Sequence, residues 1–211
     1  MRDDLNRHRA FAAALALSAV SCVHAVTIRP APSYDAYAFE AMLPLGAALH
    51  VDGERLFQEA RIAGPEEGFC EGNRYPVDSR DAFRESVIAT LERLVEHVEP
   101  TPEPLDREAM EARGLDAVFL VRADSFAMGL DGGLFRDAEA IAELTLVVSA
   151  YTRDGLQLRE TVYGSAVQQG GATSCGTLAD ILAVAVEGAI ESSMTELGEL
   201  LVNAPALRGA P

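Results

Sequence analysis

Cysteine is the residue type with the widest choice of chemistry in this chain, which contains three: Cys22, Cys70 and Cys175. A cysteine sulfur can form a thioether, pair in a disulfide or bind a metal ion as a thiolate. An odd number in an exported protein leaves at least one cysteine that needs another explanation. Whether the chain is exported therefore decides what these three residues can do.

The N-terminus has the features of a secretory signal. Arg2, Arg7 and Arg9 form a charged start, and an apolar run of eleven residues follows at 10–20. That run is too short to span a bilayer core, which needs about 20 residues. We therefore expect residues 1–21 to be a signal peptide and the mature chain to contain no transmembrane helix. A buried N-terminal helix is the alternative.

Two cleavage sites lie next to each other after the apolar run. Ala19-Val20-Ser21-Cys22 resembles the lipobox of bacterial lipoproteins, although that family usually has Leu where this chain has Ala19. The resemblance implies that Cys22 carries a diacylglycerol thioether and an N-acyl chain, which together give stable membrane anchoring. Val23 in place of an Asp after the cysteine implies the outer membrane, with the domain facing the periplasm. The rival site, Val23-His24-Ala25, would release a soluble periplasmic protein.

Lipidation of Cys22 would leave Cys70 and Cys175 as a possible disulfide pair in an oxidising compartment. The bridge would close a loop of about 105 residues, which the chain-entropy model values at about 4–5 kcal/mol. Both cysteines lie in loop-like sequence that could adapt to the bridge. Two free thiols or a metal-binding pair are the alternatives, and the lack of a nearby histidine makes a poor zinc site.

The remaining residues give little reason to expect catalysis. His50 follows an apolar strand, His97 lies among charged positions, and Ser165 lacks the second glycine of a nucleophile elbow. The Asp131–Asp137 segment lacks the spacing of an EF-hand loop, so we expect a plain turn. With no lysine in the chain, Schiff-base chemistry is excluded. We expect no enzyme activity, no metal and no cofactor.

The charge balance limits the possible partners. The formal net charge is −16, and all 17 cationic side chains are arginines. Because residues 1–21 carry three arginines and two aspartates, the mature chain is near −17. Such a chain repels nucleic acid and anionic lipid head groups, so we expect no nucleic-acid partner. Contact with a membrane would depend on the lipid anchor.

Hydrophobic periodicity predicts the elements of a single domain. Apolar residues at 83, 87, 91, 94 and 98 indicate a helix over 79–99, which Pro100 would end. Arg153-Asp154-Gly155 is typical of a hairpin turn, and Thr177 with Asp180 has the spacing of a helix cap. Residues 52–77 are expected to be mostly loop. The other expected elements are strands at 43–51, 116–128, 140–151 and 156–167, a short helix ending at Gly114, and a helix at 178–202.

These elements predict an α+β domain over residues 41–203, in the order β-α-β-β-β-α. We expect a mixed or antiparallel sheet of about four strands, with both long helices packed on one face. Residues 22–40 are expected to be a flexible tether and 204–211 a disordered tail. An apolar cluster around one strand connection is expected to form either a partner surface or a folded-back plug: Phe126, Met128, Leu130, Leu134 and Phe135.

The element pattern over about residues 40–202 resembles small envelope lipoproteins of Gram-negative bacteria. It looks like the α/β domains of the curli-secretion lipoprotein and of penicillin-binding-protein activator lipoproteins. The resemblance implies a non-enzymatic lipoprotein that binds or assembles another envelope protein. A soluble periplasmic protein that binds a small ligand is the second possibility.

Overall fold

The computed structural model describes residues 22–32, 42–63, 70, 72–132 and 137–208 of the chain. The expected signal peptide lies outside these residues. Within them, no helix is both long enough and apolar enough to cross a membrane.

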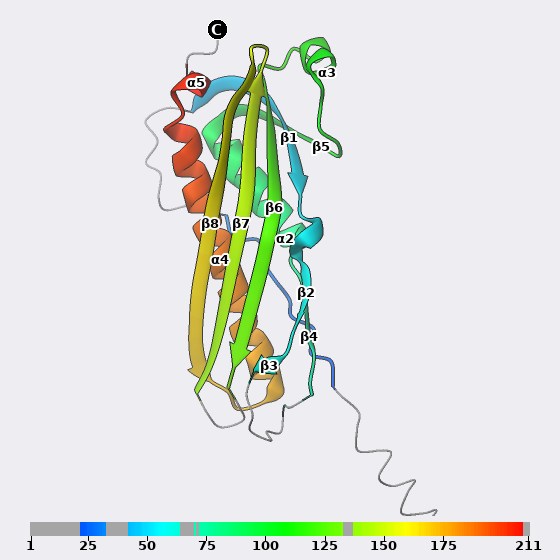
Figure 1. Cartoon of the computed structure of the whole chain (residues 1–211), viewed down its shortest axis with the longest axis vertical. Helices are drawn as coiled ribbons and strands as arrows, with labels where there is room; N and C mark the ends of the chain where they lie inside the picture. The colour runs from blue at the N-terminus through cyan, green and yellow to red at the C-terminus, as the bar shows by residue number, and fades with distance from the viewer. Residues whose placement is uncertain (1–21, 33–41, 64–69, 71, 133–136, 209–211) are drawn as a thin grey trace, which may run out of the picture.

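A mixed sheet in the order β5-β1-β6-β7-β8 forms the centre of the domain (Figure 1). β1 pairs in parallel with β5 and with β6, whereas β6, β7 and β8 form an antiparallel meander. A two-residue strand, β3, pairs in parallel with the end of β6 and brings the sheet to six strands. The bounds are β1 Leu43–Asp52, β3 Ile62–Ala63, β5 Val95–Thr101, β6 Ala117–Asp131, β7 Asp137–Thr152 and β8 Gly155–Gly171.

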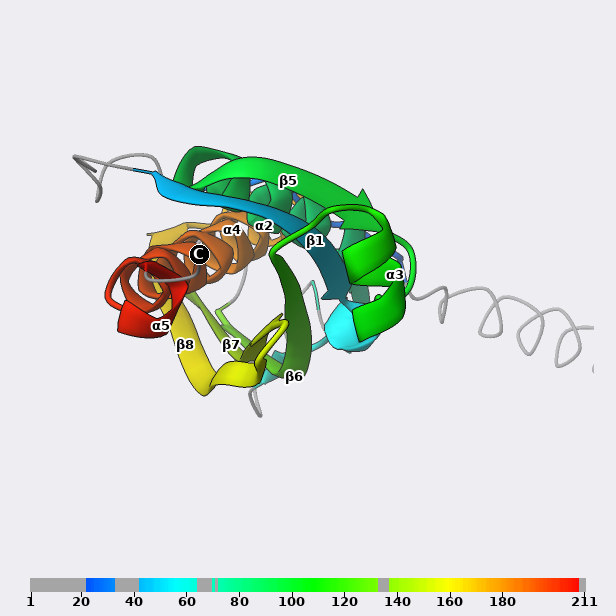
Figure 2. The same ribbon diagram turned by 90° about the horizontal axis from the view of Figure 1, so that it is seen from above.

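Two long helices lie on the same face of this sheet. α2 is Arg80–Leu94 and α4 is Cys175–Val202. Figure 2 shows the sheet curving around both helices, so this face is concave. Most of the buried apolar residues belong to one cluster between helices and sheet, which includes Phe83, Phe119 and Leu182. The expected packing of both long helices on one face is confirmed.

Short elements complete the fold. The 3-10 helix η1 (Glu54–Leu56) leads into a separate two-stranded sheet, in which β2 (Phe57–Ala60) is antiparallel to β4 (Tyr75–Asp78). On the convex face, α3 (Arg107–Ala112) buries Met110 in a second, smaller apolar cluster. The last element in the described part of the chain is α5 (Pro205–Arg208).

The single α+β domain is confirmed, but its sheet has more strands than the four expected. The missed edge strand is β5, which the sequence placed inside a helix over 79–99. α2 ends at Leu94, because Val95 adopts an extended conformation and residues 95–101 pair with β1. β-branched residues at 95 and 98 favour a strand, and Pro100 is tolerated on a strand at the sheet edge. Residues 52–77 are likewise not mostly loop, since they contain β2, β3 and part of β4.

The start of the C-terminal helix and the tail that follows the helix also differ from expectation. α4 begins at Cys175, and its cap is Ser174, whose Oγ accepts a hydrogen bond from the Thr177 amide at 3.1 Å. Thr177 is therefore inside the helix and not its cap. The expected disordered tail contains α5, where Leu207 is only 1% exposed. Burial of this leucine against the core gives residues 205–208 a reason to be ordered, and residues 209–211 lie outside the described residues.

Candidate anchor site and binding edge

Residues 22–32 lie against the domain and do not form a free tether. Val23 and Val26 make parallel bridges to Arg74 and Val77, so the segment extends the small β2–β4 sheet. Further along, the Ala31 amide donates to Ser86 Oγ of α2 at 2.9 Å. The expectation of a flexible tether is thus wrong for residues 22–32. Residues 33–40 lie outside the described residues.

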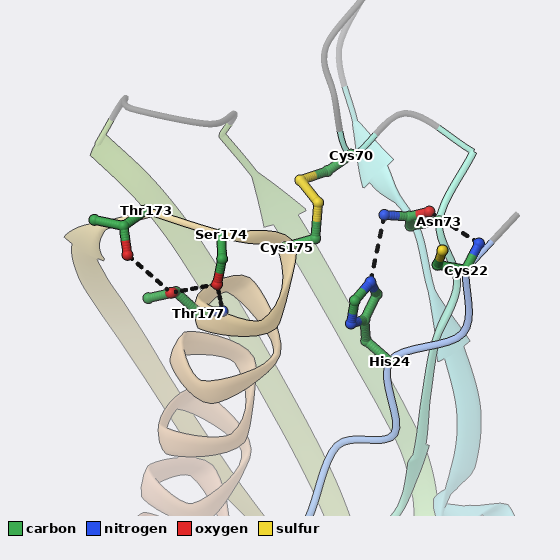
Figure 3. The surroundings of a disulfide bond; sticks show 8 residues. All are labelled: Cys22, His24, Cys70, Asn73, Thr173, Ser174, Cys175 and Thr177. Atoms are coloured by element: carbon green, nitrogen blue, oxygen red, sulfur yellow. Dashed lines mark hydrogen bonds between the residues drawn. A yellow bond between two sulfur atoms is a disulfide. The ribbon is translucent and has the colours of Figure 1, made fainter.

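Cys22 itself is exposed, and its backbone is held on both sides. Its amide donates to Asn73 Oδ1 at 3.1 Å (Figure 3), and its carbonyl accepts from the Arg74 amide at 3.1 Å. The His24 amide continues the ladder by donating to the Arg74 carbonyl at 2.9 Å. Cys22 is therefore positioned by hydrogen bonds of the kind that hold a strand in a sheet.

His24 covers a buried tyrosine next to this ladder. Its ring stacks on that of Tyr75, with the centroids 5.6 Å apart, and its Nε2 lies 3.5 Å from Asn73 Nδ2. Burial raises the pKa of Tyr75, and the nearby Asn73 side chain acts weakly in the opposite direction. Although Asn73 is close, no described residue meets hydrogen-bond geometry with the Tyr75 hydroxyl. The His24 ring thus shields the buried ring of Tyr75.

The disulfide expected between Cys70 and Cys175 is present, with the two Cα atoms 5.6 Å apart. It joins the first residue of α4 to the turn that leads to Asn73 (Figure 3). Asn73 in turn accepts the Cys22 amide hydrogen bond. One covalent bridge therefore fixes the position of the long helix and of the segment that holds Cys22.

The outer edge of β8 is a second candidate functional feature. β8 is the last strand of the sheet and is 17 residues long. Residues 161–171, with the sequence TVYGSAVQQGG, contain no charged side chain and no proline. Tyr163 and Val167 are 61% and 58% exposed. Proteins normally protect such edges with charges, prolines or bulges.

Hydrogen bonds show which backbone groups of β8 face outward. The Tyr163 amide donates to Glu196 Oε2 of α4 at 2.9 Å and so points away from β7. Backbone direction alternates along a strand, and the pairing with β7 is regular over this stretch. Ser165, Val167 and Gln169 therefore also turn their amides outward. Sequence reasoning identified this strand but missed its edge position, for which the uncharged run is the only signal.

The other residues considered for chemistry do not come together. His50 Nδ1 lies 3.4 Å from the Thr101 carbonyl, and His97 is exposed on β5. His97 was expected inside the 79–99 helix and lies instead on this edge strand. Among the described residues, no group of three or more His, Cys, Asp or Glu side chains is placed to hold a metal ion. Ser165 is exposed on the convex face of β8.

The apolar cluster at the β6–β7 connection is mostly core and not a partner surface. Phe126 and Leu130 are 6% and 1% exposed and belong to the main cluster, and Met128 packs against it. These side chains face inward because β6 continues as a regular strand through this region. Leu134 and Phe135 lie outside the described residues.

Comparison with known proteins gives no family for this chain. No protein-family model matches the sequence, and no curated protein matches it. The fold is similar to that of protein XCC0632 from Xanthomonas campestris, of the DUF330 family model, with a TM-score of 0.47 and 14% identity over 83% of this chain and 92% of that one.

Two further solved structures resemble the fold less closely. A PelC dodecamer from Paraburkholderia phytofirmans has a TM-score of 0.31 and 13% identity, over 75% of this chain and 95% of that one. Lipoprotein GNA1162 from Neisseria meningitidis has a TM-score of 0.27 and 14% identity, over 65% of this chain and 94% of that one. Similarity at this level concerns the arrangement of elements, and we draw no functional argument from it.

Proposed function

We propose that this protein is a non-enzymatic lipoprotein of the cell envelope, anchored through Cys22, that binds another envelope protein by strand addition at the β8 edge. The observation that carries the proposal is the outer edge of β8 at residues 161–171, which has no charged side chain of its own in an otherwise strongly acidic chain. The Tyr163 amide there is already bonded to Glu196. A partner strand would satisfy the outward amides of Ser165, Val167 and Gln169. It would also cover Tyr163 and Val167.

The contacts of residues 22–25 support cleavage before Cys22. An N-acylated Cys22 retains one amide hydrogen, which is the donor to Asn73 Oδ1. Cleavage after Ala25 would remove that bond, the carbonyl acceptor for Arg74 and the ring that stacks on Tyr75. The buried Tyr75 would then lose its cover. These contacts favour the lipoprotein over a soluble protein that begins at Val26.

The place of Cys22 in the fold supports a proposal for the end of the domain that would face the membrane. The N-terminal segment lies at the same end of the long axis as β3 and the start of α4, and the β7–β8 turn lies at the other end (Figure 1). Because Cys22 is held directly against the domain, no long linker separates its lipid from the disulfide end. We propose outer-membrane attachment with this end toward the bilayer and β8 along the axis leading away from it.

The anchor is tested by intact-mass analysis of the protein isolated from the cells that make it. We expect a chain that begins at Cys22 and carries the mass of three acyl chains and glycerol. The Cys22→Ala variant should lack this mass and leave the membrane fraction. A mature chain beginning at Val26 without added mass would refute the anchor.

The binding edge is tested by placing a photo-crosslinking amino acid at Tyr163 in the same cells. We expect one discrete crosslinked product, and we expect Val167→Pro to abolish it. Proline removes an outward amide that a partner strand needs, whereas β7 does not use that amide. Val167→Ala is the matched control, because it shortens the same side chain and keeps the amide.

Three outcomes would count against the β8 edge. Crosslinking of equal strength from Val184, which is exposed on α4, would mean that contact is unspecific. Loss of the product in Val167→Ala as well as Val167→Pro would assign binding to the side chain and not to strand pairing. Retention of the product in Val167→Pro would exclude pairing at this position.

A further inference from the structure

A groove with a volume of about 310 Å³ opens on the convex face of the sheet, between α3 and the β7–β8 turn. Figure 1 places both of these elements at the end of the molecule opposite the N-terminal segment. The groove is therefore separate from the proposed anchor site. Its residues are also distinct from those of the uncharged part of β8.

The inner surface of the groove is apolar. Met110 from α3 and Val118 from β6 are 1% and 3% exposed, and partly buried side chains extend the surface: Leu105, Leu120 and Tyr151. This surface belongs to the small cluster that α3 covers, so the short helix leaves part of that cluster open. Concave apolar sites with a few polar groups are typical of small-molecule binding.

The charged side chains at the rim of the groove differ in the hydrogen bonds and ion pairs that they form. Asp106 accepts the Ala109 amide at 2.8 Å, and Arg107 Nε donates to Glu111 at 2.8 Å. Asp154 follows Arg153 in the turn and lies close enough to influence Arg107. Arg153 lines the groove, yet no hydrogen bond or ion pair engages its side chain within the described part of the chain. It is thus the rim cation with its donors available.

We propose that this groove binds a single-chain amphiphile with an anionic head group, such as a medium-chain carboxylate. The chain lies on Met110, Val118 and Leu120, and the head group accepts hydrogen bonds from Arg153. The volume of the groove limits the size of the ligand. A water molecule occupies about 30 Å³ in the liquid, so the groove has room for about ten groups of that size. A lipid with two long chains is too large. This ligand class goes beyond the proposed anchor and partner.

The experiment uses decanoate as the probe and the chain from residue 22 onward, with Cys22→Ala to keep it free of lipid. Because the sequence contains no tryptophan, Tyr151→Trp places a single fluorescent reporter in the groove. We expect decanoate to shift its emission saturably, and calorimetry on the chain with Tyr151 intact to give the same affinity. Decanol and decyltrimethylammonium are the matched probes. They have the same alkyl chain as decanoate but carry a neutral and a cationic head group, respectively.

Charge selection distinguishes the proposal from unspecific adsorption. We expect decanoate to bind at least about tenfold more tightly than either matched probe, a difference of about 1.4 kcal/mol. Arg153→Glu should remove that preference, and Arg159→Glu, which changes the same charge on β8 outside the groove, should keep it. Equal binding of the three probes, an unchanged preference in Arg153→Glu or no saturable binding by calorimetry would each overturn the proposal. None of these results depends on the anchor or on the β8 edge.

Discussion

At the scale of single residues, glycine decides how closely α4 can approach the sheet. A Cβ on Gly164 of β8 would overlap the Ala189 carbonyl and the Ser193 backbone, and a Cβ on Gly188 of α4 would lie 2.8 Å from Ala166 Cβ. The two glycines let helix and strand pack backbone to backbone. Neither residue has a positive φ, so the requirement is for space and not for backbone conformation.

The change Gly164→Ala should therefore lower the free energy of unfolding by about 1–3 kcal/mol, because the helix must move away from β8. Urea denaturation of the lipid-free chain measures this difference in the free energy of unfolding. Gly171→Ala, on the same strand with nothing within 4 Å of the new Cβ, should stay close to the wild type. Equal stabilities for the two variants would show that α4 shifts at no cost.

Tyr75 provides a pH dependence at the same scale. Burial raises its pKa above the ordinary value of 10.0, so the folded state binds this proton more tightly than the unfolded state. The resulting stabilisation is complete below pH 10 and is lost as the pH rises through the folded pKa. We expect the free energy of unfolding to fall above pH 10 less steeply in Tyr75→Phe than in the wild type. The same slope in both proteins would assign the alkaline loss to other groups.

At the scale of elements, the disulfide couples α4 to the N-terminal ladder. Cys175 opens the helix, and Cys70 begins the turn whose Asn73 holds the Cys22 amide. Its span of 105 residues encloses α2 and the whole β6–β8 meander. Bridges over long loops restrict the unfolded chain most, in the chain-entropy description.

Replacing both Cys70 and Cys175 with alanine should lower the free energy of unfolding by about 2–5 kcal/mol. The measurement is urea denaturation in a Cys22→Ala background, which prevents new disulfides. Amide exchange should also become faster at residues 22–26, because their ladder loses its fixed support. If stability falls without faster exchange in that segment, the bridge stabilises the fold but does not position the anchor.

At the scale of the whole molecule, the three proposed surfaces are separated along one axis. Cys22 and the disulfide lie toward one end, β8 runs along the length, and the groove lies by the turn at the other end (Figure 1). The chain from residue 22 onward, with a net charge near −17, would be repelled by an anionic membrane surface. The proposed anchor at Cys22 would overcome that repulsion at one end only, so the groove would point away from the bilayer.

Local sequence determined most of the elements. The meander strands and the short α3 have a clear hydrophobic alternation or a capping residue, and Gly155 has the positive φ that its turn requires. The pairing of Cys70 with Cys175 could also be anticipated, once Cys22 was given another role. These features depend on residues close together in the sequence or, for the disulfide, on the number of cysteines. They do not require knowledge of which segments meet.

Tertiary structure decided the features that depend on neighbours distant in sequence. Residues 95–99 have a pattern compatible with a helix, and only pairing with β1 makes them part of a strand. The docking of residues 22–32, the exposed position of β8 and the opening beside α3 follow from the same cause. A strand satisfies its backbone through hydrogen bonds to other segments, so its place in a sheet is a property of the whole chain and not of its own sequence.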